Sequence, residues 1–154
     1  MVSHNRHLSK REQLITPYPL EDVTVMGITT SLKHYKLAWL INQTASLKLT
    51  QVTEAYYDTP EQANGHTLHF LCKTAHCAFT LVKNGLGSYE GAIVGYLIPQ
   101  LRRFDFFFAV QDATATFQVE VFRNSLSAMQ QITYLTQLPE KKWHRTDLLR
   151  VLGY

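Results

Sequence analysis

An acid inside an aromatic run is the pattern in this chain that points most clearly to a chemical role. Asp105 follows Arg102 and Arg103 and stands between Phe104 and Phe106. A carboxylate among aromatic side chains is costly to desolvate unless a partner satisfies it. Two interpretations stay open. The acid contacts a ligand or partner on an open sheet face, or it is a structural acid at a strand start, bonded to a backbone N–H or paired with one of the arginines.

Atoms that bind zinc occur close together in the middle of the chain, in His66, His69, Cys72, His76 and Cys77. Zinc ligands usually come in pairs from turns. A strand would instead point His66 and His69 to opposite faces and turn both cysteines toward the core. We therefore predict no metal site, and we expect reduced thiols and no disulfide framework.

A glycine-rich stretch at 85–91, Gly-Leu-Gly-Ser-Tyr-Glu-Gly, is the candidate phosphate loop, and Asp105 follows Gly85 by 20 residues. That distance suits a dinucleotide-binding loop. The placement does not, because Asp105 begins a strand and no clear helix opens at Gly87. We expect a flexible turn and no cofactor. No Gly-x-Ser-x-Gly elbow occurs either, so we predict no catalytic residue. An enzyme whose site is assembled from Asp105, Arg103 and the loop at Gly85 stays open as a lower-ranked alternative.

Hydrophobic periodicity predicts the elements that position these residues. In chain order they are strand 23–28, helix 32–44, strand 47–52, hairpin strands 66–73 and 76–83, strand 104–110, a helix capped by Thr114 or Thr116, and strand 130–135. A cap for the first helix is available among Thr29, Thr30 and Ser31. Whether Ala92–Ile98 is a strand or a short helix stays open.

The expected hairpin turns at Thr74-Ala75, which would place Cys72 opposite Cys77 and Phe70 opposite Phe79 on one face. The segments flanking the hairpin, 56–65 and 84–88, are polar or glycine-rich, and we expect loops there.

The strand 104–110 has two aromatic faces. Alternation places Phe104, Phe106 and Phe108 on one face and Asp105 with Phe107 on the other. If the helices cover the first face, Phe107 lies on an open face, where an exposed phenylalanine usually needs a partner.

The order β-α-β, inserted β-hairpin, β-α-β predicts an α+β fold, with a ferredoxin-like antiparallel sheet and helices on one face. ACT domains, which bind amino acids or pair through their sheets, are similar in this order alone, and fold does not fix function. We expect a flexible arm at 1–18, one domain at 19–138, and a C-terminal extension at 139–154. That extension contains a short helix. Its apolar residues need cover from the body or from another molecule: Trp143, Leu148, Leu149, Val151 and Leu152.

Composition indicates a globular protein. The 154 residues are 45% hydrophobic and 12% aromatic, with a formal net charge of +3. No apolar run suits a membrane span, and the first residues do not look like a secretory signal, so we expect a cytoplasmic protein without membrane contacts. The charge concentrates near both ends, where it favours solvated tails over nucleic-acid binding.

The segment from Ile98 to Phe106 resembles the signature of the IPExxxVDY proteins, an uncharacterised family of the Bacteroidetes. Ile98, Pro99 and Asp105 match it, while Gln100, Phe104 and Phe106 replace Glu, Val and Tyr. The segments 27–42 and 122–135 resemble the family's opening strand and helix and its closing helix and strand. The similarity extends over about residues 20–138. It implies a cytoplasmic housekeeping setting and no mechanism. Gln100 carries no charge and Phe106 no hydroxyl, so neither position can supply a catalytic acid here.

Three function classes follow from these patterns. The first is a non-catalytic interaction or regulatory domain. It would self-associate as a homo-oligomer or bind another cytoplasmic protein, and its candidate contact residues are Asp105, Phe107, Arg102, Arg103 and Trp143. The second is an RNA- or DNA-binding accessory protein that uses its basic termini. The third is a small-molecule-binding regulatory domain of ACT-like type.

Overall fold

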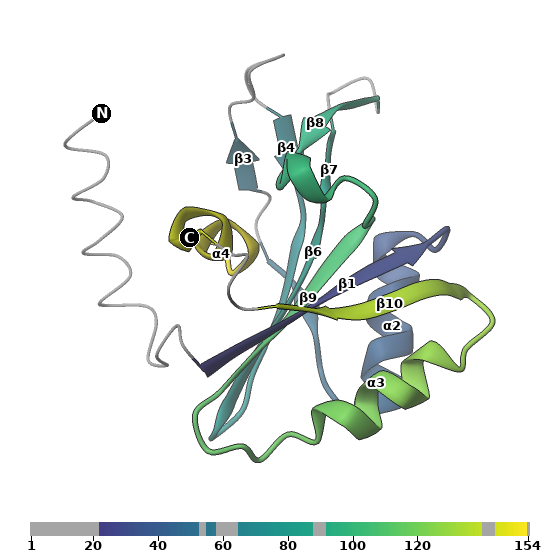
Figure 1. Ribbon diagram of the computed structural model, residues 1–154, viewed down its shortest axis with the longest axis vertical. Helices are drawn as coiled ribbons and strands as arrows, with labels where there is room; N and C mark the ends of the chain where they lie inside the picture. Colours follow the sequence, from purple (N-terminus) through teal and green to yellow (C-terminus); the bar gives the residue numbers. More distant parts are fainter. Residues whose placement is uncertain (1–21, 53–54, 58–64, 88–91, 140–143, 154) are drawn as a thin grey trace.

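The computed structural model describes residues 22–52, 55–57, 65–87, 92–139 and 144–153. Its centre is an antiparallel six-stranded sheet with the strand order β10-β1-β9-β6-β5-β2 (Figure 1). The strands are β1 (Val23–Thr30), β2 (Thr50–Gln51), β5 (His69–Lys73), β6 (Cys77–Lys83), β9 (Phe106–Asp112) and β10 (Ile132–Leu138). The expected arm at 1–18 lies outside the described residues.

A smaller sheet extends the inserted hairpin. Its order is β3-β4-β7-β8, from β3 (Ala55–Tyr57), β4 (Gly65–Thr67), β7 (Gly85–Gly87) and β8 (Ile93–Tyr96). One residue, Leu68, separates β4 from β5, and one residue, Asn84, separates β6 from β7. The expectation of loops at 56–65 and 84–88 was therefore wrong at Tyr56, Tyr57, Gly65 and residues 85–87. Glycine weakens a strand pattern but also lets neighbours approach closely. A Cβ atom at Gly65 would lie 3.0 Å from the Cβ of Leu86.

The segment Ala92–Ile98, which periodicity left undecided, forms strand β8 and then turns inward. Leu97 and Ile98 are buried after the strand ends. A 3₁₀ helix at Pro99–Leu101 follows and leads the chain back to β9. The proline therefore begins a short turn rather than ending a long element.

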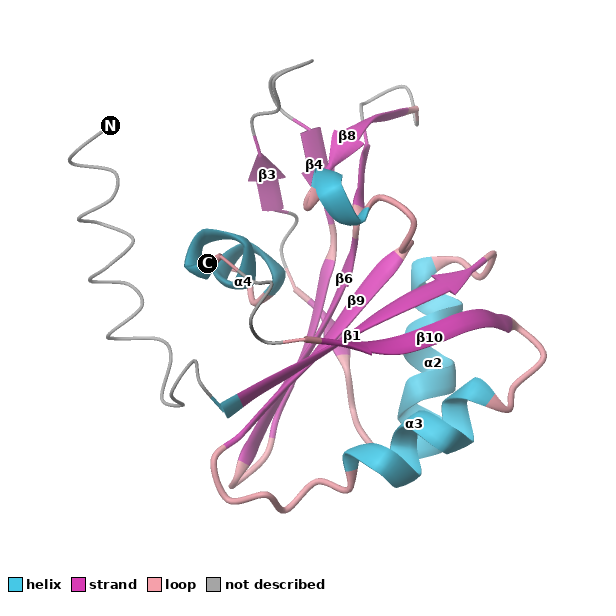
Figure 2. Ribbon diagram, in the orientation of Figure 1, coloured by secondary structure: helices cyan, strands magenta, loops and turns pink. Residues whose placement is uncertain are grey.

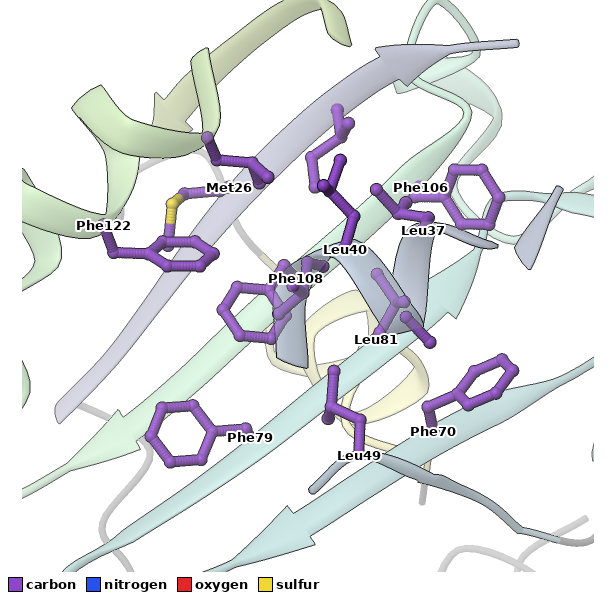
Figure 3. Close-up of a cluster of buried hydrophobic side chains, with 14 of the residues drawn as sticks. Met26, Leu37, Leu40, Leu49, Phe70, Phe79, Leu81, Phe106, Phe108 and Phe122 are labelled. Carbon is purple, nitrogen blue, oxygen red and sulfur yellow. The ribbon is translucent and has the colours of Figure 1, made fainter. Parts of the chain in front are cut away.

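Helices α2 (His34–Ala45) and α3 (Val119–Ser127) both pack on one face of the large sheet, as Figure 2 shows. They enclose the larger core, drawn in Figure 3, where the rings of Phe108 and Phe122 lie 5.1 Å apart and those of Phe79 and Phe108 lie 6.1 Å apart. The α+β class and the placement of both helices on one face are confirmed. The closer likeness to ferredoxin-like or ACT domains stays a prediction.

The helices begin without the expected caps. Lys33 stands at the N-cap of α2 and makes no side-chain capping bond. Thr30 Oγ1 instead accepts a hydrogen bond from the N–H of Leu32 at 3.1 Å and donates one to the carbonyl of Gln131 at 2.6 Å. The threonine therefore ties β1 to the start of β10 rather than capping the helix, because the helix begins two residues later than predicted.

The hairpin keeps its predicted face but not its predicted register. Cys72 pairs with Phe79 and Phe70 with Leu81. The N–H of Thr74 donates to the carbonyl of Cys77 at 2.9 Å, which makes Ala75-His76 the turn. The register differs by two residues from the prediction. Because strand side chains alternate with period two, this shift leaves the apolar residues on the same face.

A second core fills the opposite face of the large sheet, and this contradicts the expected open face. Its buried members are Val23, Val25, Val82, Leu86, Leu97, Ile98, Phe104, Phe107, Ala109, Leu138, Val151 and Leu152. Helix α4 (Arg145–Val151) contributes Val151 and half-buried Leu148, and Leu152 directly follows the helix. Cover for these C-terminal apolar residues thus comes from the body of the protein. No described helix is long and apolar enough to cross a bilayer.

Candidate functional site

Asp105 joins the end of β1 to the start of β9. Its Oδ2 accepts a hydrogen bond from the N–H of Thr30 at 2.9 Å. Its own N–H donates to the carbonyl of Ile28, and its carbonyl accepts from the N–H of Asn84, both at 2.8 Å. Within the described residues no ion pair joins it to either neighbouring arginine. The contacts support the interpretation of a structural acid at a strand start.

Asn84 holds the loop between β8 and β9 by hydrogen bonds. Its Nδ2 donates to the carbonyls of Leu101 and Phe104, both at 3.0 Å, and its Oδ1 accepts from the N–H of Ile98 at 2.9 Å. Its carbonyl accepts from the N–H of Leu97 at 2.7 Å. The buried amide therefore uses both donors and its acceptor. Sequence reasoning treated Asn84 only as part of a chain break.

Phe104 is fully buried and lies directly against β1. Its ring stacks on Tyr134 with centroids 6.3 Å apart, and the guanidinium carbon of Arg103 lies 4.9 Å from its centroid. The carbonyl of Arg103 accepts a hydrogen bond from Thr29 Oγ1 at 3.0 Å. Arg103 thus covers the ring and is fixed to β1 through its backbone.

Phe107 is 0% exposed, so it is not the exposed partner contact that alternation predicted. Its ring lies 6.3 Å from that of Phe104, inside the second core. Phe104 was also assigned to the wrong face. It precedes β9, which begins at Phe106, so strand alternation does not determine its direction.

The remaining predicted contact residues do not form one site. Arg102, Arg103 and Asp105 are exposed at one end of the large sheet, while Phe107 lies inside the second core. Trp143 lies outside the described residues. The strand that carries the phenylalanines is therefore buried, and Arg102 and Arg103 lie exposed just before it begins.

The histidines and cysteines do not converge. In the described part of the chain, no group of three His, Cys, Asp or Glu residues could hold a metal ion. His69 is buried, and its Nε2 lies 3.2 Å from the carbonyl of Arg150 in α4. Burial lowers the pKa of His69, and the bond to that carbonyl opposes the shift. This histidine therefore works as a neutral link between β5 and α4.

The glycine-rich stretch is not a phosphate loop where it is described. Gly85 pairs with Tyr96 and Leu86 with Gly95 in the small sheet, and the next described element after β7 is the strand β8. Residues 88–91 lie outside the described part. Asp105 accepts a backbone hydrogen bond from Asn84, the residue before this stretch.

The outer face of α2 carries two exposed aromatic residues that sequence reasoning missed. Tyr35 is 51% exposed and Trp39 is 62% exposed. At 100° per residue, positions 35 and 39 lie opposite the buried pair Leu37 and Ile41, and this spacing was the available signal.

A long strand forms one edge of the large sheet. β10 has seven residues, whereas β2 at the other edge has only Thr50 and Gln51. No Asp, Glu, Lys, Arg or His occurs between positions 124 and 139. Tyr134 on this strand is 52% exposed. An uncharged edge of this length is unusual, because natural edges are usually shortened, charged or covered.

No family model matches this chain, and no curated protein matches it either. The resemblance to the IPExxxVDY proteins stays a prediction.

Proposed function

We propose that this protein is a non-catalytic interaction domain that associates with a second copy of itself through the edge of β10. The observation that carries the proposal is the long, uncharged edge strand. An edge strand leaves a row of backbone N–H and C=O groups available to another chain. In the described residues, no strand pairs with β10 on the side away from β1.

The register of β10 supports pairing along most of the strand. Its residues from Tyr134 to Leu138 pair regularly with β1, and the register shift falls only at Thr29/Thr30. A bulge there bends the start of the strand and leaves the rest straight. The regular part contains tyrosine, leucine and threonine, which favour cross-strand packing in a sheet.

Self-pairing suits the charge and symmetry of this edge. Two copies of a charged edge repel each other, while two copies of β10 bring no charge together. Antiparallel pairing of identical strands creates a two-fold axis, so the same surface serves both copies and the assembly closes as a dimer. One continuous sheet would then run through both copies.

The other surfaces of the large sheet are less suitable. Helices α2 and α3 cover one face, and the second core with α4 covers the other. Self-association through an open sheet face, the expectation from alternation, therefore has no surface to use. We therefore retain the proposal of self-association but assign it to the edge of β10.

Sedimentation velocity over a wide range of protein concentration tests the proposal. We expect a monomer–dimer equilibrium for the wild-type chain and a monomer for Gln137→Lys, because this exposed position adds a charge to the edge. Gln51→Lys, at an exposed position of β2 on the opposite edge of the sheet, makes the same change away from β10 and should still dimerise. A wild-type monomer at every concentration, or equal dimerisation by both variants, contradicts the proposal.

A further inference from the structure

The outer face of α2 combines exposed aromatic rings with positive charge. No Asp or Glu occurs between positions 23 and 53, while Lys33, Lys36 and Lys48 do. Lys33 and Lys36 are exposed near the start of the helix, beside the rings of Tyr35 and Trp39. None of these lysines forms an ion pair with a described acid.

A further cation acts on the start of the helix. Lys83, at the end of β6, is exposed. Burial lowers the pKa of His34, and the charges of Lys83 and Lys33 lower it further. Both lysines therefore act on the same histidine near the start of α2. Two acids elsewhere in the fold are engaged: Asp105 with the N–H of Thr30, and Glu120 with Arg123 at 2.6 Å.

One of the two exposed rings, that of Tyr35, packs on a neighbouring ring. The ring of Tyr35 contacts the edge of His34 at a centroid distance of 5.5 Å, and His34 in turn lies 5.9 Å from Phe70 in the core. A row of rings thus connects the interior with the surface. A fixed aromatic side chain loses little entropy when a partner stacks on it.

We propose that this face of α2, defined by Lys33, Tyr35, Lys36 and Trp39, binds single-stranded nucleic acid. Lysines contact phosphates, and exposed rings stack on bases that are not stacked on each other. Tyr35 and Trp39 are one turn apart, a rise of about 6 Å along the helix. That is nearly twice the ~3.4 Å spacing of bases in a duplex strand, so the two rings suit separated bases. The inference goes beyond self-association and uses a different surface.

Other anionic partners fit this face less well. An acidic peptide would pair with the lysines and leave both rings without a stacking partner. A membrane-bound helix needs a broad apolar stripe toward the lipid, whereas the apolar stripe of α2, with Leu37 and Ile41, is buried in the core. The basic termini, which motivated the expectation of nucleic-acid binding, play no part in this site.

The test is fluorescence anisotropy of a labelled, mixed-sequence single-stranded RNA, and of the matching DNA, titrated with the full chain. We expect binding whose affinity falls as salt rises from about 50 to 200 mM. Trp39→Ala should weaken binding by about fivefold or more, and Trp39→Phe should retain it. Val121→Ala removes an exposed apolar residue from α3 and is the matched control, with unchanged affinity expected.

The contribution of the lysine charges to binding is measured separately, from the salt dependence of the affinity. Lys33→Gln combined with Lys36→Gln should reduce the slope of log affinity against log salt by about 1.4, since each phosphate contact on a single strand contributes about 0.7. Absence of binding at low salt overturns the inference. So does equal binding by wild type and Trp39→Ala, or competition by polyglutamate or anionic vesicles as effective as that by unlabelled RNA. Gln137→Lys should bind RNA normally, so failure of the dimer proposal and failure of this one are distinguishable.

Discussion

Gly27 in β1 is in direct contact with the ring of Phe104, which belongs to the second core. A Cβ atom at position 27 would lie 2.6 Å from Cδ1 of the Phe104 ring, a distance that real Cβ atoms essentially never show. The glycine in the middle of β1 therefore lets a buried ring lie flat against the strand. This contact fixes the loop that carries both exposed arginines.

Gly27→Ala should destabilise the protein by about 1–3 kcal/mol, because the added methyl group forces the ring out of its site. Urea unfolding measures the change. Phe104→Ala alone should cost about 3–5 kcal/mol, and the double variant should cost less than the sum of the two single changes, since contacting residues couple. Strict additivity would show that the ring and the strand do not meet.

Asn84→Ala should lower the free energy of unfolding by at least about 2 kcal/mol. The substitution leaves the carbonyls of Leu101 and Phe104 and the N–H of Ile98 without their partner. Asn84→Asp should not restore stability, since a carboxylate cannot donate to either carbonyl. Thermal unfolding of the two variants checks this. An aspartate variant as stable as wild type would contradict the role assigned to the amide.

Phe107→Ala and Trp39→Ala separate a buried aromatic residue from an exposed one. The first should lower the free energy of unfolding by about 3–5 kcal/mol, and the second should change it by no more than about 0.5 kcal/mol. Both follow from the exposed fractions of the two side chains, 0% and 62%. Chemical unfolding gives both values, and similar losses for the two variants would mean that Phe107 is not covered as described.

The depressed pKa of His69 predicts loss of stability in mild acid. Burial is the main cause, and the carbonyl of Arg150 opposes it. Because the folded pKa lies below the unfolded value of about 6.5, the unfolded chain binds the proton first. The contribution of neutral His69 to the free energy of unfolding is complete above pH 6.5. It is lost as the pH falls through that value toward the pKa of His69 in the folded protein. His69→Gln should flatten this part of the unfolding free energy against pH, with no change in slope above pH 7.5 relative to wild type. An unaltered slope in the acid range would exclude His69 as the cause.

Local patterns were sufficient for much of the fold. The period of apolar residues located β1, α2, α3 and the inserted hairpin, because each contributes a periodic set of apolar residues to the larger core. The buried residues Phe122 and Leu126 lie where helical spacing placed them. The small sheet was missed because glycine-containing strands such as β7 lack the apolar alternation that strands usually show.

The second core could not be predicted from local patterns. It depends on contacts between segments far apart in sequence, such as Ile98 beside Asn84 and His69 beside Arg150. Alternation correctly separated Phe107 from Phe106 and Phe108, but it could not show that α4 and the loop before β9 would cover that side. For this reason the surfaces that we assign to partner contacts are the edge of the sheet and the outer side of α2, and not the face of the sheet.

Hydrogen exchange of the backbone amides in β10, compared between dilute and concentrated protein, tests the central claim most directly. Amides from Tyr134 to Leu138 that point away from β1 should exchange quickly in dilute solution and become protected at high concentration, while those of β8 in the small sheet should not change. Protection that is unchanged by concentration in β10, or that appears only at another element, would contradict association through this edge.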